Sequence, residues 1–306
     1  MEKPLLGRRR LLELGAGTLT AAALAACTPA TEAPAGAPAA DTAATPSAGS
    51  AGSAGSTAEP LATSPQVEVT SGSFVSAFRP DISTGWSVAA PVLAGPAGQQ
   101  MLPVAVFLHG TDSNNRFPFD VLGAQAVLQR HLGEGGQPFA IASVDGGDSW
   151  WHPRADGTDT QSMLLAEFLP LLAARGLDTG RLGLFGLSMG GFGVLLLASQ
   201  GKIPGLRAVA AMSPAVWSAY DPQLEDAFDS PEDFAANDVF ALRPQLEALP
   251  KRIDCGTEDA LLATVQDYVS ALPGPIEGGF QPGGHEEVYW RLILPEVLAF
   301  LARNLG

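Results

Sequence analysis

Cysteine and positive charge are both scarce in this chain of 306 residues. The two cysteines, Cys27 and Cys255, are too few for a disulfide scaffold or a thiolate metal cluster. Lys and Arg together number 17 against 32 Asp and Glu, so the chain lacks the basic composition that nucleic-acid binding requires. We therefore expect no nucleic-acid partner and no metal centre held by thiolates.

Motifs for binding phosphate or metal ions are also missing. The glycine-rich loops are not followed by the Lys-Ser/Thr pair of a phosphate-cradling loop. The four histidines are scattered, and the acidic run 221–233 has the composition of a solvated loop rather than of a calcium site. The sequence therefore predicts no metal site and no cofactor.

Residues 1–27 have the features of an export signal. Lys3, Arg8, Arg9 and Arg10 form a positively charged start, and a modestly apolar run follows at residues 11–26. This run contains an acidic residue and many small ones, so it is too short and too polar for a membrane span of about 20 apolar residues. The Arg8-Arg9 pair and the Gly/Ala-rich core behind it resemble a twin-arginine export signal.

The end of this signal resembles a lipobox. Leu24, Ala25 and Ala26 precede Cys27, which lies where the apolar run stops. In a lipobox the cysteine thiol is diacylated and the peptide before it is removed. Lipidation of Cys27 would anchor the protein to the outer face of the membrane in the cell envelope. The alternative is a plain secretory signal that happens to contain a cysteine, which predicts a secreted protein.

The rest of the chain divides into a tether and a domain. Residues 28–65 contain only Ala, Thr, Pro, Gly, Ser, Asp, Glu and one Leu, so this segment has almost nothing to bury. We expect it to be a flexible tether. Residues 66–306 show no further break in composition and no internal repeat, which predicts a single folded domain.

Strand-like and helix-like segments alternate through this domain. Apolar runs typical of strands buried on both faces lie at residues 104–109, 139–144, 182–187, 207–213, 251–255 and 276–281. Helical patterns lie at residues 119–132, 161–174, 190–199, 239–249, 260–272 and 288–304. The alternation predicts an α/β fold with a mostly parallel central sheet and helices on both faces. Residues 67–78 and 86–92 are expected to form an antiparallel hairpin at one edge.

A candidate nucleophile lies where a predicted strand meets a predicted helix. Residues 186–190 match the pattern G-x-S-x-G, with Ser188 at the centre. The strand before it and the helix after it would place Ser188 on the sharp turn of a nucleophile elbow. Gly186 and Gly190 allow such a turn to close without Cβ clashes, and the helix N-terminus favours developing negative charge.

A serine hydroxyl needs a base to take its proton, and four histidines are available. His109 ends a central strand and comes before Ser188, so we interpret it as support for its loop. His131 lies on a predicted surface helix, and His152 lies on a loop. His285 follows a glycine-rich loop after the last predicted strand. Only His285 satisfies the α/β-hydrolase chain order of serine, acid and histidine.

The acid is expected after the predicted strand 251–255, where Glu258 and Asp259 are adjacent. A carboxylate here would accept the Nδ1 hydrogen of His285, select its tautomer and stabilise the imidazolium form. Neighbouring side chains of an extended loop point in roughly opposite directions, so only one of the two acids can serve. Asp has one fewer methylene, which suits a short and fixed reach.

Five sequence blocks in this order resemble the esterase D family of α/β-hydrolases, which includes S-formylglutathione hydrolases, feruloyl-esterase-like enzymes and mycolyltransferases. The blocks are Leu108-His109-Gly110, Asp145-Gly146-Gly147 with Trp150-Trp151, residues 186–190, residues 256–259, and Gly284-His285 with Tyr289-Trp290. The resemblance extends from about residue 104 to the C-terminus and implies an α/β-hydrolase fold. It implies Ser188 as the nucleophile, Asp259 as the acid and His285 as the base.

The elbow and the resemblance together predict an oxyanion hole. One donor would be the backbone N–H of Met189, directly after the nucleophile, and the other that of Thr111, in the loop after the first central strand. The family often has an apolar residue at the position of Thr111, which leaves the role of its side chain open. Trp150 and Trp151 follow the second central strand. They form either a substrate wall or, for one of them, core packing beneath the loop.

These features predict a serine carboxylic-ester hydrolase that acts through an acyl-enzyme on a small-molecule or cell-envelope ester. An alternative is an acyltransferase, in which the hydroxyl of a sugar or of a cell-envelope component replaces water. A second alternative is a non-catalytic surface protein that keeps the fold for binding. The intact serine, acid, histidine and elbow glycines argue against it, since a binding module has no need of all four.

Overall fold

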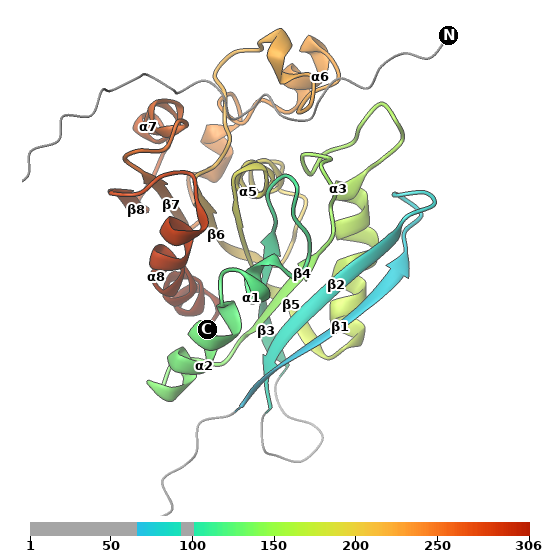
Figure 1. Ribbon diagram of the computed structural model, residues 1–306, viewed down its shortest axis with the longest axis vertical. Helices are drawn as coiled ribbons and strands as arrows, with labels where there is room; N and C mark the ends of the chain where they lie inside the picture. Colours follow the sequence, from blue (N-terminus) through green and yellow to red (C-terminus); the bar gives the residue numbers. More distant parts are fainter. Residues whose placement is uncertain (1–65, 93–100) are drawn as a thin grey trace, which may run out of the picture. The chain divides into compact units, whose positions relative to one another are not determined.

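Figure 1 shows the computed structural model of the protein, which describes residues 66–92 and 101–306. The predicted export signal at residues 1–27, with the lipobox at Cys27, and the predicted tether at residues 28–65 lie outside the described residues. No helix in the described ranges is both long and apolar enough to cross a membrane.

The described residues build one sheet of eight strands in the order β1-β2-β4-β3-β5-β6-β7-β8. Strands β3 to β8 are parallel to one another, whereas β1 and β2 run antiparallel to their neighbours. The predicted α/β fold with a mostly parallel sheet is therefore confirmed. The strands are β1 (Val67–Val75), β2 (Ser83–Pro91), β3 (Leu102–Leu108), β4 (Ala140–Val144), β5 (Leu177–Leu187), β6 (Leu206–Met212), β7 (Lys251–Gly256) and β8 (Ile276–Gln281).

The hairpin expected at one edge of the sheet is confirmed. Val67 of β1 pairs with Pro91 of β2, and Val75 pairs with Ser83. β2 continues the sheet through antiparallel pairing with β4 (Figure 1). Most side chains of β1 are exposed, whereas most of those of β2 are buried, as expected for an edge strand beside an inner one.

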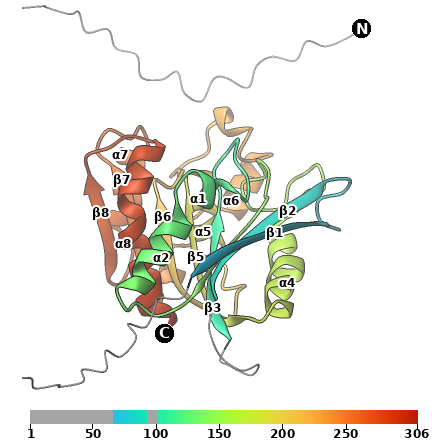
Figure 2. The same ribbon diagram turned by 60° about the horizontal axis from the view of Figure 1, so that its bottom comes forward.

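Helices cover both faces of the sheet (Figure 1). α2 and α8 pack on one face, where they contact each other, and Figure 2 shows them running side by side. α5 packs on the opposite face, which it shares with α3, α4 and α7. The helices are α1 (Phe117–Asp120), α2 (Ala124–Gly133), α3 (Thr160–Met163), α4 (Leu169–Ala174), α5 (Met189–Ser199), α6 (Pro231–Ala236), α7 (Leu262–Ser270) and α8 (Glu287–Leu305).

The central strands contain apolar runs because helices cover both faces of the sheet. In β3, Val104 and Val106 belong to the core beneath α5, while Ala105 and Phe107 belong to the core beneath α2 and α8. Successive side chains of a strand point to opposite faces, so a strand with helices on both sides needs apolar residues at every position. α5 is apolar all round for a similar reason, since all eleven of its residues are buried.

The helix expected at residues 239–249 is wrong, because the chain forms only a 3₁₀ turn there, at Arg243–Leu246. The carboxylate of Asp238 accepts a hydrogen bond from the backbone N–H of Phe240, which closes a local turn in place of a helical one. Pro244 then supplies no N–H for a continuous helix. Val239, Phe240 and Leu246 of this segment are buried, but the spacing of its apolar residues does not reflect a helix.

Two other predicted helices differ from regular α-helices: one is broken, and the other contains a π-helical turn. The helix expected at residues 119–132 divides into α1 and α2 at Gly123, whose φ of 71° lies in the left-handed region and cannot continue a helix. The helix expected at residues 161–174 is continuous, but a π-helical turn at Leu164–Phe168 separates α3 from α4. These interruptions leave the layering unchanged, because the buried faces of both helices still pack on the sheet.

Candidate active site

Ser188 occupies a sharp turn between β5 and α5. Its φ of 54° and ψ of −120° lie outside the regions that most residues adopt. The turn brings the backbone at Gly186 and Gly190 against β3, where a Cβ on either glycine would overlap the carbonyl oxygen of Leu108. The chain therefore has glycine at the two positions where the elbow touches the neighbouring strand. The strained geometry places the Ser188 side chain at the carboxyl end of the parallel strands.

Three side chains from separate parts of the chain meet at this end of the sheet. Nε2 of His285 lies 2.9 Å from Oγ of Ser188, and Nδ1 of the same ring lies 2.9 Å from Oδ2 of Asp259. Asp259 follows β7 and His285 follows β8, so parallel neighbouring strands deliver the two groups side by side. Glu258, the other candidate acid, does not contact the ring. Its carboxylate instead accepts the backbone N–H of Gly283.

The environment of Asp259 determines the tautomer of His285. Burial acts to raise the pKa of Asp259, but hydrogen bonding and charge attraction from His285 outweigh it, and the pKa is lowered. The backbone N–H of Leu261 also donates to this carboxylate, over 2.9 Å. An ionised carboxylate can only accept, so Nδ1 of His285 must carry the hydrogen. The lone pair of Nε2 then faces Ser188 and can accept its hydroxyl hydrogen.

Trp290 of α8 contacts His285 directly and is linked to Asp259 through Ser213. Its ring meets that of His285 edge to face, with centroids 5.1 Å apart, and its indole N–H donates to Oγ of Ser213 over 3.2 Å. Ser213 is fully buried with a φ of 44°, and hydrogen bonding from it helps to lower the pKa of Asp259. Neither Ser213 nor Trp290 was predicted to have a role at the site. The local signals are that Ser213 follows a predicted central strand, as Asp259 and His285 do, and that Trp290 lies in the same sequence block as His285.

The loop after β3 passes directly beside the nucleophile. A Cβ on Gly110 would lie 3.4 Å from Cβ of Ser188, which places the backbone leading to Thr111 against the elbow. His109 holds this loop in place, since its Nδ1–H donates to the carbonyl of Gly110 over 2.7 Å and its Nε2 accepts the N–H of Gly146 over 2.9 Å. Burial lowers the pKa of His109, so the ring is neutral and both bonds are satisfied. This supports its interpretation as a loop-supporting residue.

The model of the Esterase family matches this chain over residues 91–301. The match covers more than half of the chain. The chain belongs to the Esterase family. It is a carboxylic-ester hydrolase. No curated protein sequence matches it.

Solved structures similar to this esterase share the α/β-hydrolase fold. A ferulic acid esterase superposes with a TM-score of 0.68 at 20% identity, covering 79% of this chain and 100% of that one. An S-formylglutathione hydrolase from Agrobacterium tumefaciens superposes with a TM-score of 0.65 at 17% identity, covering 80% and 97%. The fluorophosphonate-binding serine hydrolase FphF of Staphylococcus aureus superposes with a TM-score of 0.63 at 18% identity, covering 77% and 98%. At these identities the likeness establishes the fold, which agrees with the fold that the motifs imply.

Of the two alternatives for Trp150 and Trp151, a substrate wall or core packing of one of them beneath the loop, the burial of both rings favours core packing. Trp151 is fully buried and Trp150 is only 4% exposed. The side chain of Trp151 fills the space beside Gly146 and Gly193, where an added Cβ would lie 2.7 and 2.6 Å from it. Its indole N–H donates to the carbonyl of His109 over 3.2 Å. Trp151 therefore packs as core beneath the loop, because burial satisfies both its large apolar ring and its single donor.

Other aromatic side chains remain partly exposed near this loop. Trp150 contacts Phe192 of α5 and, at a centroid distance of 5.3 Å, Trp217 of the segment after β6. Trp217 and Tyr220 are only half-buried. Of the aromatic residues that follow central strands, these two are therefore more accessible to a substrate of the esterase than the Trp150–Trp151 pair.

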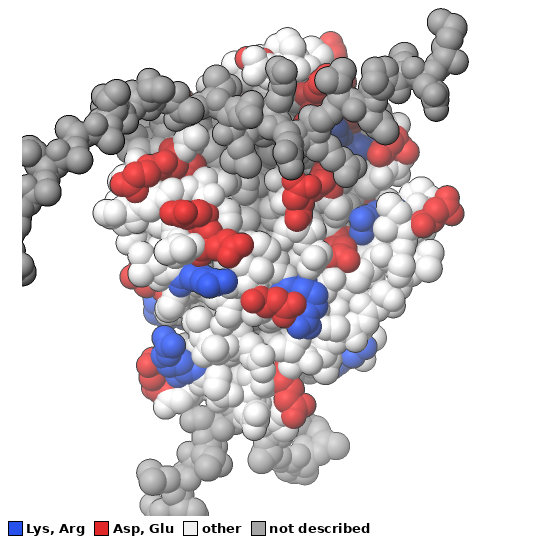
Figure 3. All heavy atoms as spheres, in the orientation of Figure 1, with Lys and Arg blue, Asp and Glu red and all other residues white. Residues whose placement is uncertain are grey.

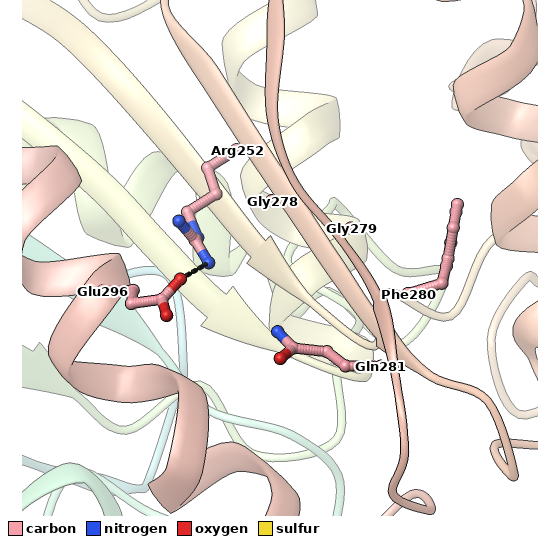
Figure 4. A pocket seen from close by; sticks show the side chains of 6 residues that line it. All are labelled: Arg252, Gly278, Gly279, Phe280, Gln281 and Glu296. Atoms are coloured by element: carbon pink, nitrogen blue, oxygen red, sulfur yellow. Dashed lines mark hydrogen bonds and ion pairs between the residues drawn. The ribbon is translucent and has the colours of Figure 1, made fainter.

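A cavity of about 300 Å³ lies between β8 and α8 (Figure 4). Its lining includes Arg252, whose guanidinium is 2.7 Å from Glu296 and 2.7 Å from the buried carboxylate of Asp254. Burial of Arg252 is therefore compensated by two acids, Asp254 of the same strand and Glu296 of α8. None of Ser188, Asp259 and His285 lines this cavity, and its charged groups are engaged with one another.

Acidic groups predominate on the surface of the esterase. On the face shown in Figure 3, Lys and Arg are few, and most of them lie beside Asp or Glu. Arg116 pairs with Asp120, and Arg291 pairs with Glu287, so these cations are locally neutralised. The net charge of the whole chain is −15, which disfavours the approach of strongly anionic substrates.

Proposed function

We propose that Ser188, His285 and Asp259 form the catalytic triad of this esterase and that its reaction passes through an acyl-enzyme on Ser188. His285 takes the proton of Ser188 as the hydroxyl attacks the acyl carbon, and returns it to the leaving alcohol. The same ring then activates a water molecule that releases the acid. Asp259 keeps the hydrogen on Nδ1 and stabilises the imidazolium that forms in each step.

The observation that carries this proposal is the unbroken chain of two 2.9 Å hydrogen bonds from Ser188 through His285 to Asp259. It includes a nucleophile, a base within reach of its proton and a carboxylate that orients the base. The three residues also follow the chain order of serine, acid and histidine. A merely structural serine would not need a strained backbone or a histidine oriented by a buried acid.

We also propose that the backbone N–H groups of Met189 and Thr111 form the oxyanion hole. Met189 is the first residue of α5, so its N–H has no partner within the helix and benefits from the positive end of the helix dipole. The loop containing Thr111 is held against the elbow by the hydrogen bonds of His109 and Trp151. Each such donor typically contributes about 3 kcal/mol to the transition state.

Labelling with a fluorophosphonate, followed by mapping of the modified peptide, tests the assignment of the nucleophile. We expect the label on Ser188, and we expect Ser188→Ala to lose labelling and to lower kcat by about 10³-fold or more. Ser199→Ala, at the other end of α5, is the matched control, because the Ser199 hydroxyl bonds only to the carbonyl of Leu196 in its own helix. Full turnover by Ser188→Ala would rule out the triad.

We further propose that the esterase is exported and held at the outer face of the membrane by a lipid on Cys27. Support for this location comes from the sequence, where the basic start, the apolar run and the residues before Cys27 resemble an export signal with a lipobox. In that position the enzyme would meet esters of the cell envelope and small esters from outside the cell.

A further inference from the structure

Glu258 connects the acid loop to the histidine loop. After β7 and β8 end, paired at Gly256 and Gln281, their two chains continue side by side. The N–H of Thr257 donates to the carbonyl of Gln281 over 2.9 Å, and the N–H of Glu258 donates to the carbonyl of Gly283 over 3.0 Å. The side chain of Glu258 completes the connection, because its Oε2 accepts the N–H of Gly283.

Both backbone groups of Gly283 are thus bound by a single residue. The carboxylate of Glu258 is itself oriented, since its Oε1 accepts the hydroxyl hydrogen of Thr257 over 3.0 Å. Gly283 lies two residues before His285, so this pair of bonds determines where the histidine loop leaves the sheet.

The loop needs such a restraint because of its composition. Gly283 has a φ of 146°, a conformation that other residues rarely adopt, and a Cβ there would overlap the ring of Tyr289. Gly284 follows, so the two residues before His285 are the most flexible kind of backbone. Without an external contact, the loop would sample many positions, and the imidazole would sample them with it.

We propose that Glu258 is a positioning residue that holds the imidazole of His285 between Ser188 and Asp259. The inference rests on the proposed function, since it assigns Glu258 a role only if His285 is the base. Glu258 acts through its acceptor oxygen and not through its charge. Displacement of a catalytic group by about 1 Å can cost as much as 10²-fold in rate, so a contact of modest strength can control the rate without controlling the fold.

Three variants separate the effect of the hydrogen-bond acceptor on Glu258 from the effect of its negative charge. Glu258→Ala removes both, whereas Glu258→Gln keeps an amide oxygen that can accept from Gly283. Glu286→Ala is the matched control, because Glu286 is an exposed carboxylate directly after His285 whose side chain does not cap α8. The Glu258 side chain is exposed as well, so all three variants should fold, and their melting temperatures report whether they do.

The rate of nitrophenolate release from a p-nitrophenyl ester, in the burst and in the steady state, gives the first readout. We expect Glu258→Ala to lower kcat and kcat/KM together by about tenfold with KM unchanged, as when only the transition state loses an interaction. We expect Glu258→Gln and Glu286→Ala to stay within about threefold of the wild type. Wild-type kcat in Glu258→Ala, or equal losses in Glu258→Gln and Glu258→Ala, would overturn the proposal.

Amide hydrogen exchange in residues 282–285 gives a readout that does not depend on activity. We expect faster exchange in Glu258→Ala and wild-type exchange in Glu258→Gln. Exchange that is unchanged in Glu258→Ala would refute the restraint itself. If Ser188→Ala kept its activity, the proposed triad would fail. If Ser188→Ala were inactive and Glu258→Ala fully active, only the role of Glu258 would fail.

Discussion

Replacement of Asp259 by asparagine tests how the triad selects the state of its histidine. Oδ1 of Asp259 accepts the N–H of Leu261 over 2.9 Å, and Oδ2 faces Nδ1 of His285 over 2.9 Å. In Asp259→Asn the amide oxygen would keep the bond to Leu261, which leaves the NH₂ group facing the ring. An amide nitrogen can only donate, so Nδ1 would have to accept and the ring hydrogen would move to Nε2.

The consequence for catalysis follows from this shift of one hydrogen. With the hydrogen on Nε2, the ring would donate to Ser188 instead of accepting its proton, and the imidazolium would lose a buried negative partner. The shape and volume of the site would stay nearly the same. We expect kcat to fall by up to about 10⁴-fold, which is about 5 kcal/mol of transition-state stabilisation.

Steady-state hydrolysis of p-nitrophenyl acetate by purified Asp259→Asn measures this loss. Glu258→Gln is the matched control, because it makes the same chemical change one residue earlier and should alter kcat by less than about threefold. Melting temperatures close to that of the wild type would show that both variants are folded. A severe loss in Glu258→Gln with a mild loss in Asp259→Asn would mean that the acid has been assigned to the wrong residue.

Three further predictions concern the stability provided by the loop after β3, the pH dependence of that stability, and the N-terminus. Trp151→Phe leaves the buried carbonyl of His109 without its donor, so urea denaturation should show a loss of about 1–3 kcal/mol in the free energy of unfolding, and wild-type stability would contradict this. Burial lowers the pKa of His109 in the folded state, so the unfolded chain takes up the proton first as the pH falls. The free energy of unfolding should therefore decrease below about pH 6.5, and His109→Gln should lose that part of the slope, whereas an unchanged slope would refute the reasoning. The exported protein should partition into detergent and become soluble as Cys27→Ser, and recovery of the wild type wholly in the aqueous phase would exclude the lipid anchor.

Sequence patterns predict the structure of this protein correctly where a strand or a turn itself requires the pattern. The apolar runs of the central strands reflect burial on both faces, so the strands occur close to their expected positions. The elbow was recognisable because Gly186 and Gly190 must both lack a Cβ for Ser188 to turn against β3. Patterns failed where local hydrogen bonds replaced a regular element. At residues 239–249 the apolar spacing resembles that of a helix, but Asp238 and Pro244 favour a turn.

Residue types and chain order alone show which groups are available: a serine at an elbow, two adjacent acids after one strand, and a histidine after the next. Side-chain reach and the family resemblance favoured Asp259 over Glu258, but residue spacing alone could not show which acid faces the histidine, because that depends on how two loops pair beyond the ends of β7 and β8. In the folded chain Asp259 turns inward to His285, while Glu258 binds Gly283. The same holds for Trp151, which packs in the core because Gly146, in its own loop, and Gly193, in α5, leave space for its ring. Local geometry follows from neighbouring residues, whereas the direction of a side chain in a loop follows from contacts that only the folded chain brings together.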